Sequence, residues 1–319
     1  MQRKLVLAGL FLLAAATGAR AEYPDKPVKI VVPVAAGGGV DVMARLFAEK
    51  VAPILGVPVI VENRAGASGT VGGQAVYQSA PDGYTLLFVP LTHVMANIVL
   101  KSVPYNSVDD FTPVARVGES SMLVVQSTKM APKTLGEVAV AARENPADWT
   151  IATSGLGSAG HVASIELSNV SKSNMTITPY RGTAPALTDV MGGHVQLLID
   201  SIVTLLPAAR DGKVRALAIT ASKRSALAPE VPTAVESGMP TLTFTSWFGF
   251  FGPKNMPKEV VAKLNATFNE AGRKLAEEKR LDPLGADPVA ETPKDFVRFV
   301  RVQVERNTKL LQSAGFKPE

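Results

Sequence analysis

The stretch Val28-Lys29-Ile30-Val31-Val32-Pro33-Val34-Ala35-Ala36-Gly37-Gly38-Gly39-Val40-Asp41 decides the fold class. Its first seven residues are almost continuously apolar, which is typical of a strand buried on both faces of a parallel sheet. After the glycine loop, Val42, Leu46 and Val51 recur at helical spacing with charged residues between them. A strand, a glycine loop and a helix in this order form the repeating unit of α/β proteins.

The same unit recurs along the chain and restarts after Asn145-Pro146. Loops and turns separate its parts, among them the glycine-rich run 66–73 and Pro81-Asp82-Gly83. The two runs predict two similar lobes, each a mostly parallel sheet flanked by helices, joined by short crossing strands. Besides 28–34, strands are predicted at residues 58–61, 85–89, 149–153, 175–178, 195–199 and 214–220.

The C-terminal part follows a different pattern, in which apolar stripes at helical spacing have no strands between them. Pro257 and Thr292-Pro293 stand where helices can begin, because proline fits the first helical turn and threonine caps it. We expect these helices to pack on the first lobe.

The N-terminal end has the layout of a secretory signal peptide. Arg3 and Lys4 precede the apolar stretch 5–16, and Ala19-Arg20-Ala21 supplies the small residues of a cleavage site. The apolar stretch is too short to span about 30 Å of hydrocarbon. We expect cleavage after Ala21, which lowers the formal net charge from +5 to +2 because three cations lie in residues 1–21.

Composition excludes several classes of protein. The 319 residues include no cysteine, which removes disulfides, thiolate metal sites and cysteine nucleophiles. Three histidines are too few and too scattered to suggest a metal cluster, and no cofactor is expected. A nearly neutral mature chain gives little support to nucleic-acid binding.

Two glycine loops, at residues 36–41 and 154–160, stand between a buried strand and a helix. Such a loop presents backbone N–H groups at a helix N-terminus, where the helix dipole favours an anion. Each glycine also has a simpler explanation as part of a tight turn. Two loops in corresponding positions of two lobes favour one anionic ligand held between them.

The second loop also matches a dinucleotide-binding fingerprint. Gly155, Gly157 and Gly160 have the G-x-G-x-x-G spacing, after a strand and before a helix. A nucleotide-dependent oxidoreductase is therefore the alternative function. The next strand lacks the acidic residue that would bind the ribose, although Arg181 could suit a 2′-phosphate.

A secreted hydrolase is a third reading of the sequence. No G-x-S-x-G elbow occurs, and Ser158 and His161 on one helical turn seldom align as nucleophile and base. His161 is more simply a group that closes its loop or donates to a ligand. His93 and His194 have no predicted partner, and a capping or solvent-exposed role is expected for both.

Two aspartates border the predicted site. Asp41 falls in the first turn of its helix, where capping is its expected role. Asp200 ends a strand on the ligand-binding side of an α/β fold. There it would repel an anion, unless it meets an amine or hydroxyl of the ligand or is neutralised by Arg181. Arg181 and Thr183 could add donors, and Arg181 could equally be a solvated surface arginine.

Over almost its whole mature length, the chain resembles the periplasmic substrate-binding proteins of tripartite tricarboxylate transporters, also called the Bug family. The resemblance rests on segments that would each be weak alone and are specific in order. These are residues 23–27 (Tyr-Pro-Asp-Lys-Pro), 36–41, 61–66 (Val-Glu-Asn-Arg-Ala-Gly), 80–87, 110–115, 154–161, 179–187 (Pro-Tyr-Arg-Gly-Thr-Ala-Pro-Ala-Leu), 215–218, 231–233 and 246–249.

The resemblance implies a two-lobed, type II periplasmic-binding fold without catalysis, located in the periplasm. It implies a signal peptide at 1–21, lobe one at 22–123 and 246–319, and lobe two at 124–245. It implies a small carboxylate ligand in the cleft, an integral-membrane permease of a secondary transporter as partner, and a monomer. Val34, Ala35, Ala36 and Leu156 depart from residues common in the family, which leaves the identity of the ligand open.

The predicted site takes backbone groups from both glycine loops and polar side chains beside them. The predicted ligand-binding residues are Val34, Ala36, Gly37, Gly38, Gly39, Thr92, Ser154, Gly157, Ser158, His161, Tyr180, Arg181, Thr183 and Asp200.

Overall fold

The computed structural model describes residues 23–37 and 39–319, so the predicted signal peptide and Gly38 lie outside the described residues. The strands are β1 (Val28–Val32), β2 (Val59–Asn63), β3 (Thr85–Pro90), β4 (Phe111–Ser127), β5 (Thr150–Thr153), β6 (Thr176–Pro179), β7 (Leu197–Ser201), β8 (Val214–Ile219), β9 (Thr245–Pro253) and β10 (Ala286–Pro288). The helices are α2 (Gly39–Leu55), α3 (Thr70–Tyr77), α4 (Leu91–Val99), α5 (Leu135–Glu144), α6 (Ala159–Ser171), α7 (Thr183–Gly192), α8 (Ile202–Arg210), α9 (Lys258–Glu277) and α10 (Pro293–Ser313). Short 3₁₀ turns are η1 (Ala67–Gly69), η2 (Pro146–Asp148) and η3 (Asp282–Leu284).

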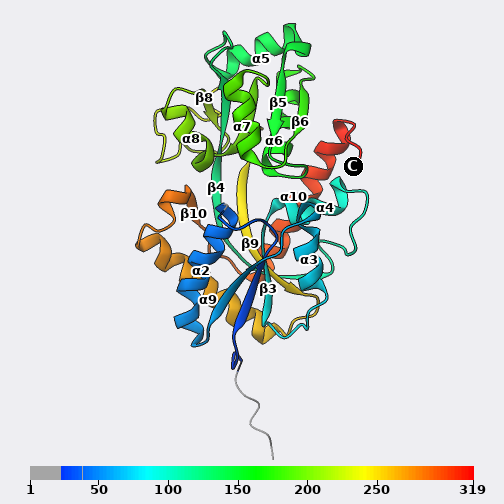
Figure 1. Ribbon diagram of the computed structural model, residues 1–319, viewed down its shortest axis with the longest axis vertical. Helices are drawn as coiled ribbons and strands as arrows, with labels where there is room; N and C mark the ends of the chain where they lie inside the picture. Colours follow the sequence, from blue (N-terminus) through cyan, green and yellow to red (C-terminus); the bar gives the residue numbers. More distant parts are fainter. Residues whose placement is uncertain (1–22, 38) are drawn as a thin grey trace, which may run out of the picture.

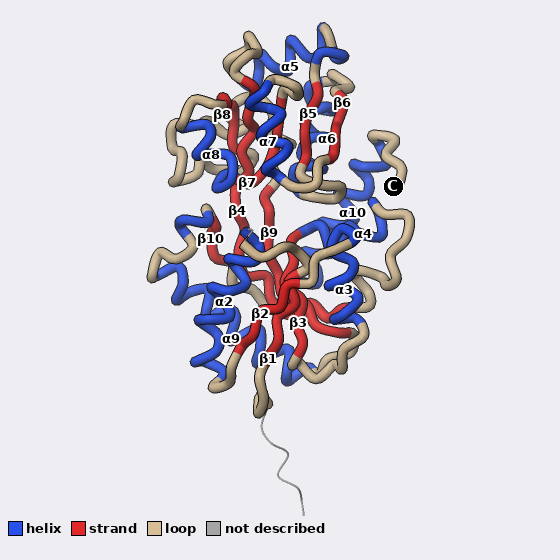
Figure 2. Tube along the Cα trace, viewed as in Figure 1, coloured by secondary structure: helices blue, strands red, loops and turns tan. Residues whose placement is uncertain are grey.

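The described strands form one mixed sheet that runs through both halves of the molecule (Figure 2). Its order is β2-β1-β3-β9-β4-β7-β5-β6, and β8 and β10 also pair with β4. We define lobe 1 as the half with β1, β2, β3, β9, β10 and the first part of β4, and lobe 2 as the half with β5 to β8 and the rest of β4. The predicted α/β fold with two lobes is confirmed.

Among the strands named above, parallel strand pairs involve three strands in each lobe. In lobe 1, β1 pairs in parallel with β2 and β3; in lobe 2, β5 pairs in parallel with β6 and β7. All pairs made by β4 are antiparallel, as is the β3–β9 pair. The carboxyl ends of the parallel strands carry both predicted glycine loops, which is the edge where open α/β sheets bind ligands.

The connection between the lobes is longer than the short crossing strands that the sequence suggested. β4 has 17 residues, and it pairs with β9 as far as Ser121 and with β7 from Met122 onward. Figure 1 shows β4 and β9 side by side where they pass between the lobes. The predicted lobe boundaries, at 123/124 and 245/246, remain a prediction.

Aromatic packing explains why α2 and α9 cover the sheet of lobe 1. Phe47 of α2, Phe250 of β9 and Phe268 of α9 are all fully buried. The ring centroids of Phe250 and Phe268 lie 3.8 Å apart, and those of Phe47 and Phe250 lie 5.9 Å apart. Burial of aromatic side chains contributes strongly to core stability. The packing of α9 agrees with the expectation for the C-terminal helices.

The last helix, α10, differs from that expectation because it contacts both lobes. It packs on β4 and α4, and also on α6 of lobe 2. Its buried Val300 and Leu311 belong to a hydrophobic cluster that includes Met95 of α4 and Val162 of α6. The two lobes therefore share one continuous apolar core beside α10.

Two glycines expected in a loop lie instead within helix α3. A methyl group on Gly73 would come within 2.0 Å of the Tyr105 hydroxyl oxygen, and one on Gly72 within 2.8 Å of Pro33 Cβ. Glycine is needed at these two positions because neighbouring atoms leave no room for a side chain, and the helical backbone conformation does not itself require glycine. In residues 23–37 and 39–319, no helix has the length and hydropathy needed to cross a membrane.

Candidate functional site

The first glycine loop is held by a buried carboxylate. The N–H of Gly37 donates to Asp41 Oδ2 at 2.8 Å, and Arg45 Nε lies 3.0 Å from the same oxygen. Asn63 Nδ2 donates to Asp41 Oδ1 and to the Val34 carbonyl. Burial acts to raise the pKa of Asp41, but these hydrogen bonds outweigh it and hold that pKa below its ordinary value. Asp41 thus holds its helix start, as predicted, and the Gly37 amide is not free for a ligand.

The second glycine loop is held by a buried imidazole. Ser158 caps α6, its Oγ accepting from the His161 main-chain N–H at 3.1 Å. His161 Nδ1 in turn accepts from the Gly157 N–H at 3.1 Å. His161 is 3% exposed, and burial lowers its pKa from 6.5 to about 4. The ring is therefore neutral at pH 7 and closes the loop.

This network explains the residues that suggested a hydrolase or a nucleotide-dependent oxidoreductase without either function. The Ser158 hydroxyl bonds the main chain of His161, and the Nδ1 atom of His161 is occupied by Gly157, so a nucleophile–base pair is not formed. Gly160 is required because a methyl group there would come within 2.2 Å of the Ile199 carbonyl oxygen. The fingerprint spacing is thus explained by packing of α6 on β7.

Helix α4 of lobe 1 is where the second loop meets the other lobe. A methyl group on Gly157 would lie 3.1 Å from Met95 Cβ and 3.1 Å from Val99 Cγ2. Thr92, a predicted site residue, lies one turn before Met95 and about two turns before Val99 on the same helix. The structure therefore places Gly157 of lobe 2 against the helix of lobe 1 that carries Thr92.

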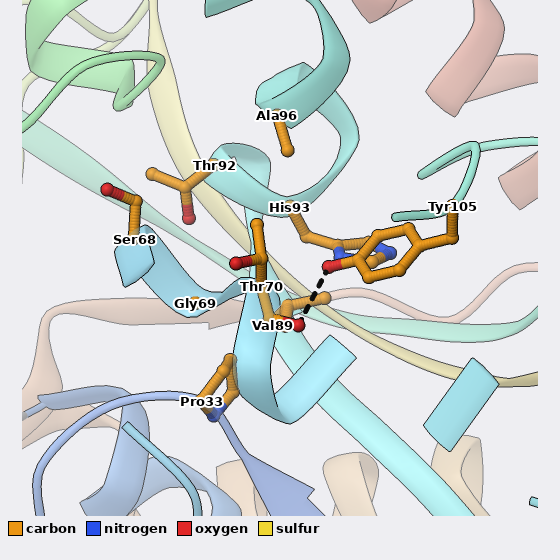
Figure 3. Close-up of a pocket in the computed structure, with 9 residues that line it drawn as sticks. All are labelled: Pro33, Ser68, Gly69, Thr70, Val89, Thr92, His93, Ala96 and Tyr105. Carbon is orange, nitrogen blue, oxygen red and sulfur yellow. Dashed lines mark hydrogen bonds between the residues drawn. The ribbon is translucent and has the colours of Figure 1, made fainter. Parts of the chain in front are cut away.

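A small cavity of about 10 Å³ lies beside the N-terminal turns of α3 and α4 (Figure 3). Ser68 and Thr92 lie at one end of it, and the rings of His93 and Tyr105 lie at the other. The Tyr105 hydroxyl donates to the Thr70 carbonyl at 3.5 Å. The lining residues are Pro33, Ser68, Gly69, Thr70, Val89, Thr92, His93, Ala96 and Tyr105.

One wall of this cavity is a left-handed turn. Gly66, Ala67, Ser68 and Gly69 all have positive φ, with values of 44° for Ala67 and 54° for Ser68. Side chains other than glycine rarely adopt this conformation, and such strain clusters at functional sites. The turn is stabilised locally, because Thr70 Oγ1 donates to the Ala67 carbonyl at 2.8 Å.

The expectation of an exposed or capping role was wrong for His93 and right for His194. His93 is 7% exposed and packs edge-on against Phe111, with ring centroids 4.6 Å apart. Burial, opposed only in part by a hydrogen bond with the Ser107 backbone, lowers its pKa from 6.5 to about 3. His194 is exposed. The aromatic pocket around His93 is formed by residues distant in sequence.

The remaining predicted residues of lobe 2 gather at the carboxyl ends of β6 and β7. Thr183 Oγ1 donates to Asp200 Oδ2 at 2.9 Å, and the Tyr180 hydroxyl donates to Asp189 at 2.6 Å. Burial and the Asp189 carboxylate raise the pKa of Tyr180 to about 12. Arg181 is exposed and forms no ion pair within the described part of the chain, so it does not neutralise Asp200 there.

The residues of the first loop differ in exposure. Ala36, Gly37 and Gly39 are exposed, while Val34 is half-buried. The Ser154 carbonyl of the second loop accepts from Gly182 at 3.0 Å. Within residues 23–37 and 39–319, no hydrogen bond joins residues 34–37 to the second loop.

A larger groove lies elsewhere on lobe 1. It has a volume of about 320 Å³ between β4 and α10, and none of the predicted residues lines it. Its charged rim is already paired, because Lys254 lies 2.9 Å from Asp110 and Arg301 lies 3.1 Å from Asp109. The small cavity, in contrast, is lined by Thr92 of α4, the helix that Gly157 of the second loop approaches.

The sequence matches the family model described as tripartite tricarboxylate transporter family receptor over residues 43–316. The chain belongs to this family. It is similar to the periplasmic binding protein BugD, with 34% identity and a TM-score of 0.79 over 93% of this chain and 100% of that one. It is also similar to a protein of R. palustris solved with adipate, with 30% identity and a TM-score of 0.81 over 93% of this chain and 100% of that one. A third similar structure is MatC of Rhodopseudomonas palustris with bound malate, with 35% identity and a TM-score of 0.78 over 91% of this chain and 100% of that one.

The family consists of receptors that bind substrates, not of enzymes. The sequence did not predict that the turn with Ser68 and Thr70 lines the candidate site of such a receptor. A signal was available, because this turn follows β2, and β2 is the parallel neighbour of β1. The carboxyl ends of neighbouring parallel strands lie at one edge, so the two loops had to be adjacent.

Proposed function

We propose that this receptor binds a small carboxylate, of the dicarboxylate class, beside α4 and between the glycine loops of the two lobes. The observation that carries the proposal is the contact of Gly157 with Met95 and Val99, on the helix whose Thr92 lines the cavity of lobe 1. The carboxylates bound in the two R. palustris proteins support the ligand class. The predicted residues from Val34 to Asp200 remain the proposed binding set, in which Gly37 and Gly157 line the site while their amides bond Asp41 and His161.

Backbone dipoles supply most of the positive potential in this proposal. The N-termini of α3 and α4 beside the cavity have no side-chain cap, and Arg45 and Arg64 near the first loop are paired with acidic residues. Each helix N-terminus is worth about 0.3–1 kcal/mol to an anion, and each hydrogen bond to a charged group about 1.5–3 kcal/mol. Several such bonds support micromolar binding, about −8 kcal/mol, after the cost of ordering.

The cavity of about 10 Å³ has room for a single water molecule only, so it is too small for a dicarboxylate. Binding therefore requires the segments around it to move apart. A ligand that touches both lobes then favours the closed arrangement. We propose that a membrane permease recognises this closed form. The lobes would be 22–123 with 246–319, and 124–245, in a periplasmic monomer cleaved after Ala21.

Native mass spectrometry of protein purified gently from the periplasm tests this function. We expect a retained small diacid, and titration calorimetry with malate, adipate and succinate should give at least one dissociation constant in the micromolar range. In the same experiment, the intact mass of the protein shows where the signal peptide is cleaved. Absence of binding to every dicarboxylate at millimolar concentration contradicts the proposal.

A further inference from the structure

The chain after α10 turns back across the junction between the lobes. Gly315 has a φ of +67° and ends the helix, and the Phe316 N–H bonds the Leu311 carbonyl at 3.0 Å. Further on, the Glu319 N–H donates to the Val99 carbonyl at 3.1 Å, and the Lys101 N–H donates to the Glu319 main-chain oxygen at 2.9 Å. These two bonds attach the tail, residues 314–319, to the end of α4 in lobe 1.

The same tail also contacts lobe 2. The Phe316 ring lies against His161 of α6, with centroids 5.3 Å apart and an interplanar angle of 66°. Figure 1 shows the end of α10 beside α6 and α4. Phe316 is half-buried in the cluster that both lobes share.

The contacts form a closed circuit. His161 accepts from the Gly157 N–H, and Gly157 lies close to the Val99 side chain. The Val99 carbonyl in turn accepts from Glu319, in the tail that carries Phe316. We propose that residues 314–319 are a strap that positions the Gly157 loop against α4, with Phe316 as the positioning residue. The inference rests on the proposed function, because it assigns the strap to the proposed binding loop.

The physical link is the exclusion of water from His161. Phe316 covers one edge of the imidazole, so the ring stays neutral and its Nδ1 lone pair remains available to the Gly157 N–H. A protonated ring has no acceptor at Nδ1, so loss of the cover weakens the hold on the loop as the pH falls toward and below the ordinary value of 6.5. Charged groups on the elements around His161 include Glu166 on α6, Lys101 after α4, Glu305, Arg306 and Lys309 on α10, and Lys317 and Glu319 in the tail. In the described part of the chain, none of them hydrogen-bonds the imidazole.

The test compares Phe316→Ala with two companions. Phe316→Tyr keeps an aromatic ring on His161 and serves as the rescue variant. Phe299→Ala is the matched control, because Phe299 lies on α10, which leads into the tail, but packs on Trp247, with centroids 5.6 Å apart, and under the Arg116 guanidinium. Thermal unfolding first establishes that each variant is folded.

Two measurements read the strap. Nuclear magnetic resonance follows hydrogen exchange of the Gly157 amide and titration of His161 without ligand. In Phe316→Ala we expect roughly tenfold faster exchange of that amide and a His161 pKa nearer its ordinary value. Calorimetry with malate and adipate should show affinity roughly tenfold weaker in Phe316→Ala, and unchanged in Phe316→Tyr and Phe299→Ala.

The outcomes separate the strap from the proposed function. If the exchange rate of the Gly157 amide and the pKa of His161 are unchanged in Phe316→Ala, the strap is overturned, whatever the affinity for dicarboxylates. If the original protein binds no dicarboxylate, the proposed function fails, and the resonance signals alone decide whether the tail positions the loop. An equal change in Phe299→Ala shows a general loss of packing and also overturns the inference.

Discussion

The two glycine loops have the same plan but opposite chemistry. In each, one amide bonds a side chain from the first turns of the following helix, four residues along: Gly37 bonds Asp41, and Gly157 bonds His161. The first acceptor is an ionised carboxylate held by Arg45 and Asn63. The second is a neutral imidazole covered by Phe316.

The difference shows how one backbone motif can be stabilised in two ways. The first loop depends on charge, and its residues Ala36, Gly37 and Gly39 are exposed. The second depends on exclusion of water and is pressed on α4, so its position depends on parts of the chain far away in sequence. Substitutions that change charge should therefore affect the first loop, and those that change burial the second.

The largest expected effect comes from placing a negative charge in the second loop. Ser158→Asp keeps a good N-cap for α6, because aspartate caps helices as well as serine does. A carboxylate within about 4 Å of a bound anion costs up to about 4 kcal/mol at an effective dielectric of 20. We expect at least about a hundredfold loss of affinity for the dicarboxylate that the original protein binds, measured by calorimetry.

Ser158→Asn is the control for that substitution, because asparagine caps equally well without a charge. It should bind within a fewfold of the original protein, with similar thermal stability. Equal affinity of the Asp and Asn variants would remove Ser158 from the binding site.

The next effect distinguishes packing from conformation among the glycines. Gly160→Ala drives a methyl group to within 2.2 Å of the Ile199 carbonyl oxygen, and should cost about 3 kcal/mol of unfolding free energy. Gly39→Ala meets nothing within 4 Å at the start of α2 and should change stability by less than about 0.5 kcal/mol. Urea unfolding of both variants measures the difference. Equal stabilities would show that α6 moves off β7 at little cost.

A smaller effect is expected from removing the charge under the first loop. Asp41→Asn leaves one acceptor oxygen where Gly37, Arg45 and Asn63 all donate, so a donor loses its partner. We expect about 2 kcal/mol of destabilisation by urea unfolding, since hydrogen bonds to charged groups are worth about 1.5–3 kcal/mol. Glu62→Gln, which removes the half-buried carboxylate that pairs with Lys29 and Arg64, is the control and should cost no more than about 1 kcal/mol. If the two variants lose the same amount, the Asp41 network does not stabilise the loop.

Local patterns predicted the parts of the fold that are local. Apolar runs gave the parallel strands, and Thr292 caps α10 with its hydroxyl accepting from Asp295 as its position indicated. β4 was not recognised, because one strand serves two sheet regions and carries Arg116 and Glu119 among its apolar residues. Helix α4 has only nine residues, which is shorter than the window in which a helical periodicity can be recognised.

The missed parts of the site depend on contacts between distant residues. His93 looks like a surface histidine in sequence, and its burial comes from Tyr105, Phe111 and Phe251 around it. Phe316 meets His161 only because α10 crosses from one lobe to the other. The spacing of residues in the sequence does not predict such contacts. A strand, a loop and a helix can be predicted because their pattern lies within about thirty residues.

Acidification separates the two loops most directly, because each histidine adds only a gradual change in stability with pH. His161 has a folded-state pKa of about 4 and His93 one of about 3, both below the ordinary 6.5. The unfolded chain therefore binds more protons between these values and pH 6.5, so stability is complete above pH 6.5 and falls as the pH is lowered through this window. Each histidine contributes at most about 1.4 kcal/mol per pH unit. The lowered pKa of Asp41 acts in another window, because its contribution is present above 3.8 and is lost only at lower pH.

Urea unfolding from pH 7 to pH 4.5 measures this slope. His161→Gln should reduce it, while His194→Gln, at an exposed position, should leave it unchanged. Over the same range, intrinsic rates being accounted for, exchange of the Gly157 amide should lose protection while that of Gly37 keeps it. Equal behaviour of the two amides would mean that the loops do not differ in the group that holds them, and the comparison between carboxylate and imidazole would fail at its first step.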